Sequence, residues 1–260
     1  DGLLEYGPSG NAGSWVGGVG QRPANWWDTI GFGHEDAYSN ALAYRACNDM
    51  AELATVLGKD GGLYQSHAEK MKRNYLTHFL NPATGVLAGW KSADGKLHDY
   101  AFTFVNGIAI SYGLVSIEEG RKILDRMQAK FKEVGYTRFD LGLPGNLIPI
   151  RREDYVDLEP RWGGPKNEDG SDGFQKYENG GATACFAYYY IDALYRVGRR
   201  EEADAILLPM LEAFERGAFQ GGDGSGMTND WKKWDGTPGG YEGLLVDGYK
   251  TLMAVLSRLR

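Results

Sequence analysis

Seven segments with helical periodicity follow one another along this chain of 260 residues, and they alternate between two kinds. The first kind is rich in small and aromatic residues and covers about 36–57, 100–114, 181–197 and 239–259. The second kind is strongly charged and covers about 62–80, 116–134 and 200–216. Such alternation is typical of repeated hairpins in which an apolar inner helix precedes an amphipathic outer helix. The sequence therefore predicts an all-α fold of helical hairpins.

Local signals set the expected ends of several helices. Gly58 stops the first helix and Pro82 follows the second, since glycine accepts a left-handed backbone and proline does not continue a helix. Ser116 and Glu119 form a capping box at the start of the fourth. No segment shows sustained strand alternation, so strands are expected only as short hairpins within loops.

The long connections all precede inner helices. Residues 1–33, 135–177 and 217–238 are rich in Gly, Pro or Trp, whereas the turns into the outer helices are short. A connection of such length inside a compact domain is usually functional. Because hairpin geometry gathers these loops at one end of the inner helices, we expect the functional site there.

Composition excludes several classes of partner. The net charge is −7 and no basic run is present, which argues against nucleic acid and against acidic membrane surfaces. No apolar run approaches the roughly 20 residues that span a bilayer. No signal sequence is visible, so a cytoplasmic location and export after processing both stay open. Cys47 and Cys185 are the only cysteines, and we interpret both as buried thiols rather than a disulfide framework.

The stretch Trp26-Trp27-Asp28 carries the strongest chemical signal. Indole rings are flat apolar surfaces that suit the C–H faces of a sugar. A carboxyl beside them loses water, which raises its pKa as a proton donor to a glycosidic oxygen requires. The alternative interpretation is a pair of core tryptophans with an Asp that caps a helix.

Three segments together point to one group of enzymes. Trp27-Asp28 is followed by residues 36–58, which run from Asp36-Ala37-Tyr38 to Gly58, and residues 177–181 and 234–240 stand before later inner helices. This combination resembles the six-hairpin glycosidases, the (α/α)6-barrel enzymes that include trehalases, processing α-glucosidases, mannosylglycerate hydrolases and α-L-rhamnosidases. The resemblance implies an (α/α)6 toroid, a glycoside substrate, no cofactor, and Asp28 as general acid.

The chain departs from that family in two respects. A complete barrel of this kind has twelve helices, so residues 1–260 are expected to be one barrel domain or its C-terminal part. We therefore expect another chain or a missing N-terminal segment to complete the barrel. The family's general base is usually a Glu before an aromatic residue in the last loop, but the stretch from Asp230 to Asp235 contains no Glu.

The general base therefore has several candidates. Inverting hydrolysis needs an acid and a base roughly 6.5–9.5 Å apart. Glu178 opens an inner helix beside Asn179 and two glycines that allow close approach of a ligand. Its alternative role is a carboxylate stabilised by the helix dipole. Glu242 and Asp235 are the rivals from the last loop.

Further residues are predicted to bind the sugar. The aromatic candidates are Trp26, Trp27, Trp90, Trp231 and Trp234, and the polar candidates are His34, Glu35, Asn179 and Asp235. His34, Glu35 and Asp36 are adjacent and do not face one point, so no metal site is predicted. The acidic stretches 167–172 and 222–226 do not match the EF-hand spacing and are interpreted as solvated loops.

The favoured function is an inverting glycoside hydrolase. Two alternatives are a non-catalytic carbohydrate-binding toroid, which the missing Glu favours, and a helical scaffold, which the long aromatic loops disfavour. Seven helices do not close a ring of twelve. We therefore expect apolar faces to be exposed on the first and the last of the seven helices. The residues expected to form them are Ala41, Leu42, Met50 and Leu53 on the first helix and Leu244, Leu245, Leu252, Val255 and Leu256 on the last.

Overall fold

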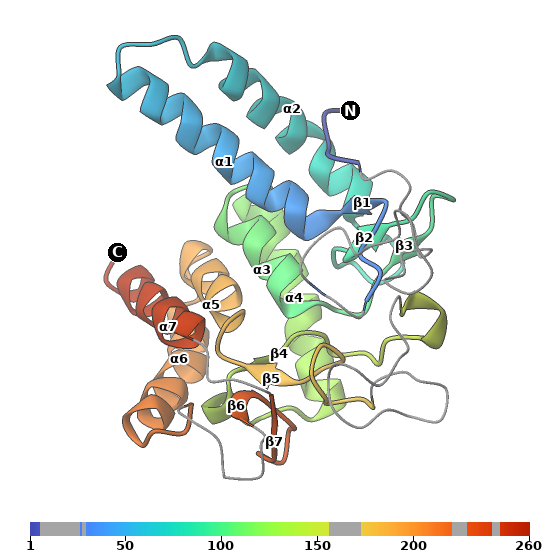
Figure 1. Ribbon diagram of the computed structural model, residues 1–260, viewed down its shortest axis with the longest axis vertical. Helices are drawn as coiled ribbons and strands as arrows, with labels where there is room; N and C mark the ends of the chain where they lie inside the picture. Colours follow the sequence, from blue (N-terminus) through green and yellow to red (C-terminus); the bar gives the residue numbers. More distant parts are fainter. Residues whose placement is uncertain (6–26, 28–29, 156–172, 220–227, 241–244) are drawn as a thin grey trace.

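The structure is a computed structural model that describes residues 1–5, 27, 30–155, 173–219, 228–240 and 245–260. Three helical hairpins and one further helix form the framework (Figure 1). The hairpins are α1 (Ala37–Val56) with α2 (Gly62–Phe79), α3 (Thr103–Ser111) with α4 (Ile117–Val134), and α5 (Ala187–Arg196) with α6 (Arg200–Glu215). The last helix is α7 (Leu245–Arg258). The predicted alternation of inner and outer helices is confirmed, since α1, α3, α5 and α7 pack on one another in that order.

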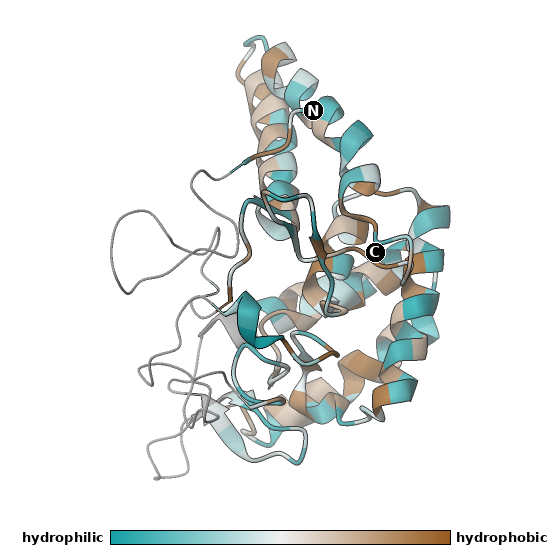
Figure 2. Cartoon of the chain, turned by 90° about the vertical axis from the view of Figure 1, so that its right-hand side faces the viewer, coloured by the Kyte–Doolittle hydropathy of each residue, from teal (hydrophilic) through white to brown (hydrophobic). Residues whose placement is uncertain are grey.

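Helices with strong local signals have nearly the predicted ends. The Asp36 carboxylate accepts hydrogen bonds from the backbone N–H groups of Tyr38 and Ser39 and so caps α1. The Ser116 hydroxyl accepts from the Glu119 N–H at the start of α4, and Gly135 ends that helix with φ +71°. Outer helices such as α4 present apolar residues to the inner layer and polar residues to solvent (Figure 2).

Two small antiparallel sheets lie in the connections. The first is β1 (Glu35–Asp36), β2 (Trp90–Lys91) and β3 (Leu97–His98), with Asp36 opposite Trp90 and Trp90 opposite His98. The second has the order β4 (Leu143–Pro144), β5 (Ala182–Thr183), β6 (Thr228–Lys232) and β7 (Pro238–Gly240). The predicted short hairpins are therefore present. The second sheet also joins the two connections that precede α5 and α7, an arrangement that the sequence did not predict.

Inner helices begin later than predicted. The predicted starts at residues 100, 181 and 239 compare with the observed starts of α3, α5 and α7 at Thr103, Ala187 and Leu245. The cause is strand and bridge pairing, because Phe102 pairs with Asn146, β5 pairs with β4 and β6, and β7 pairs with β6. Apolar runs of this kind do not distinguish a buried strand from the first turn of a helix.

The row of inner helices is open at both ends. All nine residues of α3 are buried, whereas α1 is buried mainly in its first two turns. Among the described residues, Leu42, Met50 and Leu53 on α1 and Leu252 and Leu256 on α7 are exposed as predicted, with Leu53 at 48% and Leu252 at 54%. Ala41 is buried and Val255 is partly buried, so the prediction fails for these two, and the side chains of Leu244 and Leu245 lie outside the described residues.

Two further expectations concern the cysteines and the membrane. Cys185 is a buried free thiol as predicted, but Cys47 is only partly buried because it lies on the exposed half of α1. Within the described ranges, every helix is too short or too polar to cross a bilayer.

Candidate functional site

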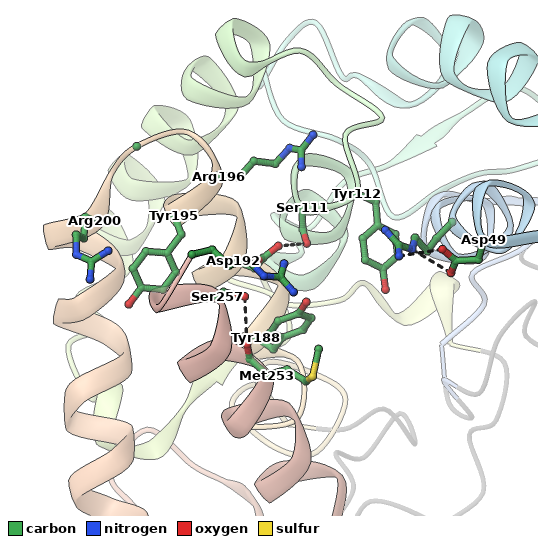
Figure 3. A pocket seen from close by; sticks show the side chains of 13 residues that line it. Asp49, Ser111, Tyr112, Tyr188, Asp192, Tyr195, Arg196, Arg200, Met253 and Ser257 are labelled. Atoms are coloured by element: carbon green, nitrogen blue, oxygen red, sulfur yellow. Dashed lines mark hydrogen bonds and ion pairs between the residues drawn. The ribbon is translucent and has the colours of Figure 1, made fainter. Parts of the chain in front are cut away.

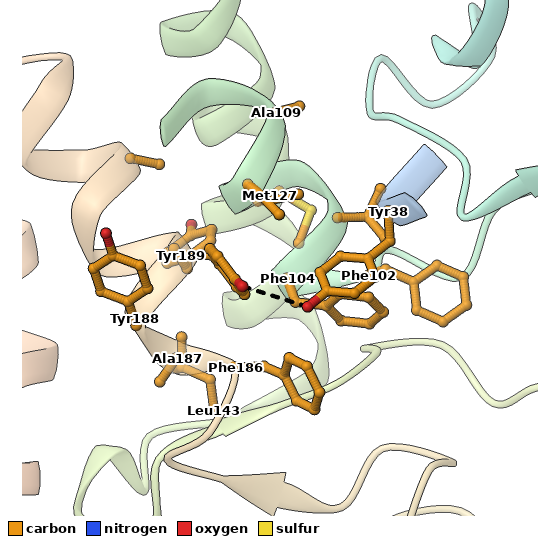
Figure 4. Packing of buried hydrophobic residues seen from close by; sticks show 14 of the residues in the cluster. Tyr38, Phe102, Phe104, Ala109, Met127, Leu143, Phe186, Ala187, Tyr188 and Tyr189 are labelled. Atoms are coloured by element: carbon orange, nitrogen blue, oxygen red, sulfur yellow. Dashed lines mark hydrogen bonds between the residues drawn. The ribbon is translucent and has the colours of Figure 1, made fainter. Parts of the chain in front are cut away.

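An aromatic cluster marks the end of the inner helices where their connections meet. The Trp27 ring has no exposed surface and stacks on Phe104 of α3, with 4.5 Å between ring centroids and 15° between planes. Phe186, just before α5, lies 4.9 Å from Trp27, and Trp231 of β6 meets Trp27 edge-on at 6.0 Å. Figure 4 shows Phe104 and Phe186 side by side in this core. Residues from the first loop and the last loop are therefore in contact, as the hairpin pattern predicted.

The loop that carries Glu178 joins the same cluster. Glu178 is fully buried, and the Tyr177 ring lies 5.4 Å from that of Trp231. A Cβ on Gly181 would lie 2.5 Å from the Tyr177 carbonyl oxygen and 3.0 Å from the Trp231 ring, so only glycine fits there. Three segments far apart in sequence thus meet through the rings of Trp27, Trp231 and Tyr177, and Glu178 directly follows Tyr177.

A pair of asparagines holds this loop in place. The Asn179 side-chain oxygen accepts from the Ile150 N–H at 2.9 Å, and the Asn146 side-chain oxygen accepts from the Gly180 N–H at 2.9 Å. Asn146 also donates to the Ile148 carbonyl, and both asparagines are buried. Asn179, predicted to bind substrate, therefore connects two loops instead. Sequence reasoning missed Asn146, which has no local signal beyond its place after Pro144 and Gly145.

Backbone strain gathers in the same connections. Among the described residues, the non-glycine residues with positive φ are Phe32 at 35°, Ala101 at 51°, Gln175 at 69° and Tyr177 at 43°. All four lie before inner helices, and Tyr177 directly precedes Glu178. Such conformations cost of order 1–3 kcal/mol each and cluster at functional sites. They support a functional role for this end of the molecule.

A buried polar network lies behind the first loop. His98 Nδ1 is 2.9 Å from the Asp154 carboxylate, and Tyr100 donates its hydroxyl to the same carboxylate. The Asp154 backbone carbonyl accepts from the Gly31 N–H at 2.9 Å. Burial, together with the bond to Asp154, raises the pKa of the Tyr100 hydroxyl. The network thus fixes the loop that leads from Trp27, and sequence reasoning missed it.

The same network includes Ser92, whose hydroxyl lies 2.9 Å from His98 Nε2. Ser92, His98 and Asp154 therefore follow the order of a Ser-His-Asp triad. The Ser92 hydroxyl, however, also lies 2.5 Å from an oxygen of Asp94, and the bond to Ser92 lowers the pKa of that carboxyl. A hydroxyl that donates its single proton to Asp94 has none to give to His98, so this arrangement favours a structural role over acyl transfer.

Trp90 and Trp27 do not present their rings to a ligand. Trp90 has no exposed surface and stacks on His98, with 4.6 Å between centroids and an angle of 4°. Phe32 contacts both tryptophans, with its ring centroid 4.9 Å from that of Trp90 and 5.7 Å from that of Trp27. Both rings are packed inside the described part of the chain, as the alternative interpretation of core tryptophans expects, and their contact with a sugar stays a prediction. Trp231, only 2% exposed, is also packed within the cluster.

The remaining described candidates are spread around this cluster. Trp234 is partly buried and donates its indole N–H to the Gly180 carbonyl at 2.7 Å, which ties the last hairpin to the Glu178 loop. Asp235 is exposed and accepts from the Thr237 N–H, and these bonds to Thr237 lower its pKa. Asp235 therefore stabilises the turn between β6 and β7.

His34 and Glu35 face the other side of the first loop. The His34 side chain is 26% exposed and lies 3.9 Å from Glu5. Glu35 is buried, and its carboxylate lies 2.5 Å from His78 of α2. The Glu35 carboxylate therefore already has a hydrogen-bonding partner in His78, and sugar binding by Glu35 stays a prediction.

Three predicted residues lie outside the described residues: Trp26, Asp28 and Glu242. One buried cation within the described part was not predicted. Lys232 of β6 is 3% exposed, and its ammonium nitrogen lies 3.6 Å from the centre of the Phe219 ring.

A separate cavity of about 690 Å³ lies between the middle of α1 and the C-terminal parts of α3, α5 and α7 (Figure 3). Its lining comes from α1, α3, α5 and α7, and Arg45 forms an ion pair with Asp49 at 2.8 Å. Asp192, also in the lining, accepts a hydrogen bond from Ser111. Because both end helices contribute to it, this cavity belongs to the open side of the row and not to the Glu178 site.

The fold defined by these hairpins is that of the (α/α)6 toroid glycosidases, present here as an incomplete toroid. Solved structures with this arrangement include the GH63 mannosylglycerate hydrolase from Thermus thermophilus in complex with Tris and D-glycerate, with a TM-score of 0.60 and 15% identity over 86% of this chain and 46% of that chain. The same enzyme in complex with glucose gives a TM-score of 0.57, 15% identity, and coverage of 86% and 47%.

The chain thus spans just under half the length of the solved structures that it matches. This share fits the predicted C-terminal half of a barrel. No family model matches the sequence, and no curated protein matches it either. An identity near 15% shows a shared fold, but it does not show a shared activity or substrate.

Proposed function

We propose that this chain carries the C-terminal half of the catalytic barrel of an inverting glycoside hydrolase. The observation that carries the proposal is Glu178, a fully buried carboxyl group at the end of the inner helices where three loops meet. Glu178 is an ionisable group without exposed surface, and it directly follows Tyr177, whose backbone has a positive φ of 43°. A buried ionisable group beside a strained backbone is typical of catalytic sites, which supports a catalytic role for Glu178.

The proposed roles follow from inverting hydrolysis. Asp28, next to the buried Trp27, donates a proton to the glycosidic oxygen, and Glu178 accepts a proton from a water molecule on the opposite face of the sugar. Glu178 acts on a water enclosed with it, since the carboxylate has no contact with bulk solvent. Glu242 is the rival base. Asp235 is a weaker candidate for the general base than Glu178 or Glu242, because its exposed carboxylate accepts a hydrogen bond that stabilises a turn.

The substrate is proposed to be a glycoside of a hexose. Two of the matching solved structures are of a mannosylglycerate hydrolase, one of them in complex with glucose, so mannosylglycerate and glucosides are the first compounds to test. Further helical hairpins, on another chain or on a segment that precedes this one, are proposed to close the ring. They would cover the exposed faces of α1 and α7 and the cavity between them.

The decisive experiment is a panel of aryl α- and β-glycosides plus mannosylglycerate, assayed with the partner or segment that closes the ring. Asp28→Asn and Glu178→Gln should each lower kcat by about 10²–10⁴-fold, while Asp235→Asn should retain activity. Azide should restore turnover in Glu178→Ala by replacing the activated water. Rescue of Glu242→Ala instead would move the base to the last loop. Sugar binding without hydrolysis in the wild type would favour the carbohydrate-binding alternative.

A further inference from the structure

Three potential metal ligands from distant parts of the sequence meet on the α2 side of the molecule. They are Asp1, Glu35 of β1 and His78 in the last turn of α2, and one ligand atom from each lies within 4.8 Å of the other two. Glu35 is 5% exposed, and its Oε2 lies 2.5 Å from His78 Nε2. A buried carboxylate and a nearby second carboxylate attract a cation, because one imidazole supplies at most a single positive charge.

The backbone around these ligands is held by other contacts. Asn74, one helical turn before His78, donates to the Asp1 carbonyl at 2.7 Å, so the two side chains share one face of α2. Asn40 of α1 accepts from the Leu4 N–H and donates to the Leu4 carbonyl, at 2.7 and 3.1 Å. The first residues are thereby fixed across α1 and α2, and the ligands converge before any ion binds.

We propose that Asp1, Glu35 and His78 bind a divalent transition-metal ion, with Zn²⁺ as the preferred ion. Zinc takes imidazole nitrogen and carboxylate oxygen at about 2.0–2.2 Å, and three protein ligands leave a fourth position for water. Neighbouring ligands of a tetrahedral ion at these lengths are about 3.3 Å apart. The His78–Glu35 pair must therefore separate by less than 1 Å, and the Asp1 carboxylate oxygen, already within 4.8 Å of the other two ligand atoms, must approach them slightly. Mg²⁺ and Ca²⁺ prefer all-oxygen sites and should bind poorly.

This site is distinct from the Glu178 site and does not depend on glycosidase activity. Sequence analysis excluded a metal because His34, Glu35 and Asp36 do not converge, whereas folding brings Glu35 to a helix more than forty residues further along. A bound ion would join the start of α1, through β1, to the end of α2. Its expected effect is therefore greater stability of the first hairpin.

The test is calorimetric titration of metal-stripped, untagged protein with Zn²⁺, together with Co²⁺ absorption spectra as a report on imidazole coordination. We expect one Zn²⁺ per chain, and at least tenfold weaker binding in His78→Ala and in Asp1→Asn. His67→Ala is the matched control, because His67 is exposed on the same helix, and its affinity should equal that of the wild type. Zn²⁺ should raise Tm in the wild type and the control but not in His78→Ala.

Asp1→Asn alters an exposed side chain, so it tests the site even if His78→Ala fails to fold. A chain lengthened by Gly-Ser before Asp1 should bind Zn²⁺ equally, which separates the carboxylate from a terminal amine. No saturable binding of Zn²⁺ or Co²⁺ would overturn the proposal. Equal affinity in all variants would do the same, and would leave His78 and Glu35 as a buried ion pair alone.

Discussion

Replacing Gly107 by alanine should destabilise the protein through the contact between α3 and α5. A Cβ at this position would lie 2.5 Å from the Tyr190 backbone nitrogen and 2.6 Å from the Tyr189 carbonyl carbon. Ordinary contacts at such a Cβ are 3.4 Å or longer, so one helix must shift by about 1 Å. Both clashing atoms belong to the backbone of a buried helix, which leaves no flexible side chain to move aside.

The magnitude follows from two opposing terms. Overpacking of a core costs about 1–3 kcal/mol, and a clash with backbone belongs at the upper end. Alanine is a better helix former than glycine by about 1 kcal/mol. We therefore expect a net loss of about 2 kcal/mol in the free energy of unfolding, and a fall in Tm of about 4–8 °C for a chain of this size.

Urea unfolding followed by far-UV circular dichroism measures this loss. Gly248→Ala is the matched control, because a Cβ on that glycine of α7 meets nothing within 4 Å. It should leave stability unchanged or raise it by up to about 1 kcal/mol. If Gly107→Ala were as stable as the wild type at an unchanged m-value, α3 and α5 would not be held at the separation described here, and the reasoning would be refuted.

Three further predictions concern buried charge and the open ends of the helix row. Asp154→Ala should lower stability by about 3–5 kcal/mol in urea unfolding, because it leaves buried His98 without the carboxylate. Burial raises the pKa of the Asp99 carboxyl, so the wild type loses stability as pH rises through that pKa. The stability of Asp99→Asn relative to the wild type should therefore increase as the pH rises above about 4, the ordinary pKa of an Asp carboxyl group. Leu53→Ser and Leu252→Ser, at exposed positions, should change stability by less than about 0.5 kcal/mol but reduce self-association in light scattering.

The outer layer of the fold was predictable because its signals are local. Ser116 and Glu119 sit three residues apart, and the hydrogen bond between them is the one that their spacing requires. The starts of α3 and α5 were not predictable in this way. The residues just before these helices pair with strands or single residues of other connections. The residue pattern of one segment alone does not reveal such a pairing.

The candidate site shows the same division. Hairpin geometry predicted that the loops of Trp27, Glu178 and Trp231 share one end of the molecule, and the ring contacts confirm it for Trp27 and Trp231. Which aromatic rings stay open to a ligand depends on packing from all sides, so the sequence did not distinguish the buried Trp90 from the partly exposed Trp234. The pair His98 and Asp154 lies 56 residues apart and had no local signal.

The Glu178 loop and the two end helices, α1 and α7, differ in how far they depend on a segment that would close the ring. The Glu178 loop is already held from within this chain, by Asn146, by Trp234 and by the sheet that contains Trp231. The faces of α1 and α7 are apolar and exposed instead, and they gain free energy only when covered. A segment that closes the ring would therefore contribute mainly stability and an enclosed substrate space, while the proposed base is positioned without it. Glu178 should then remain buried in the chain alone, and hydrolysis should depend on ring closure for substrate binding more than for placement of this carboxylate.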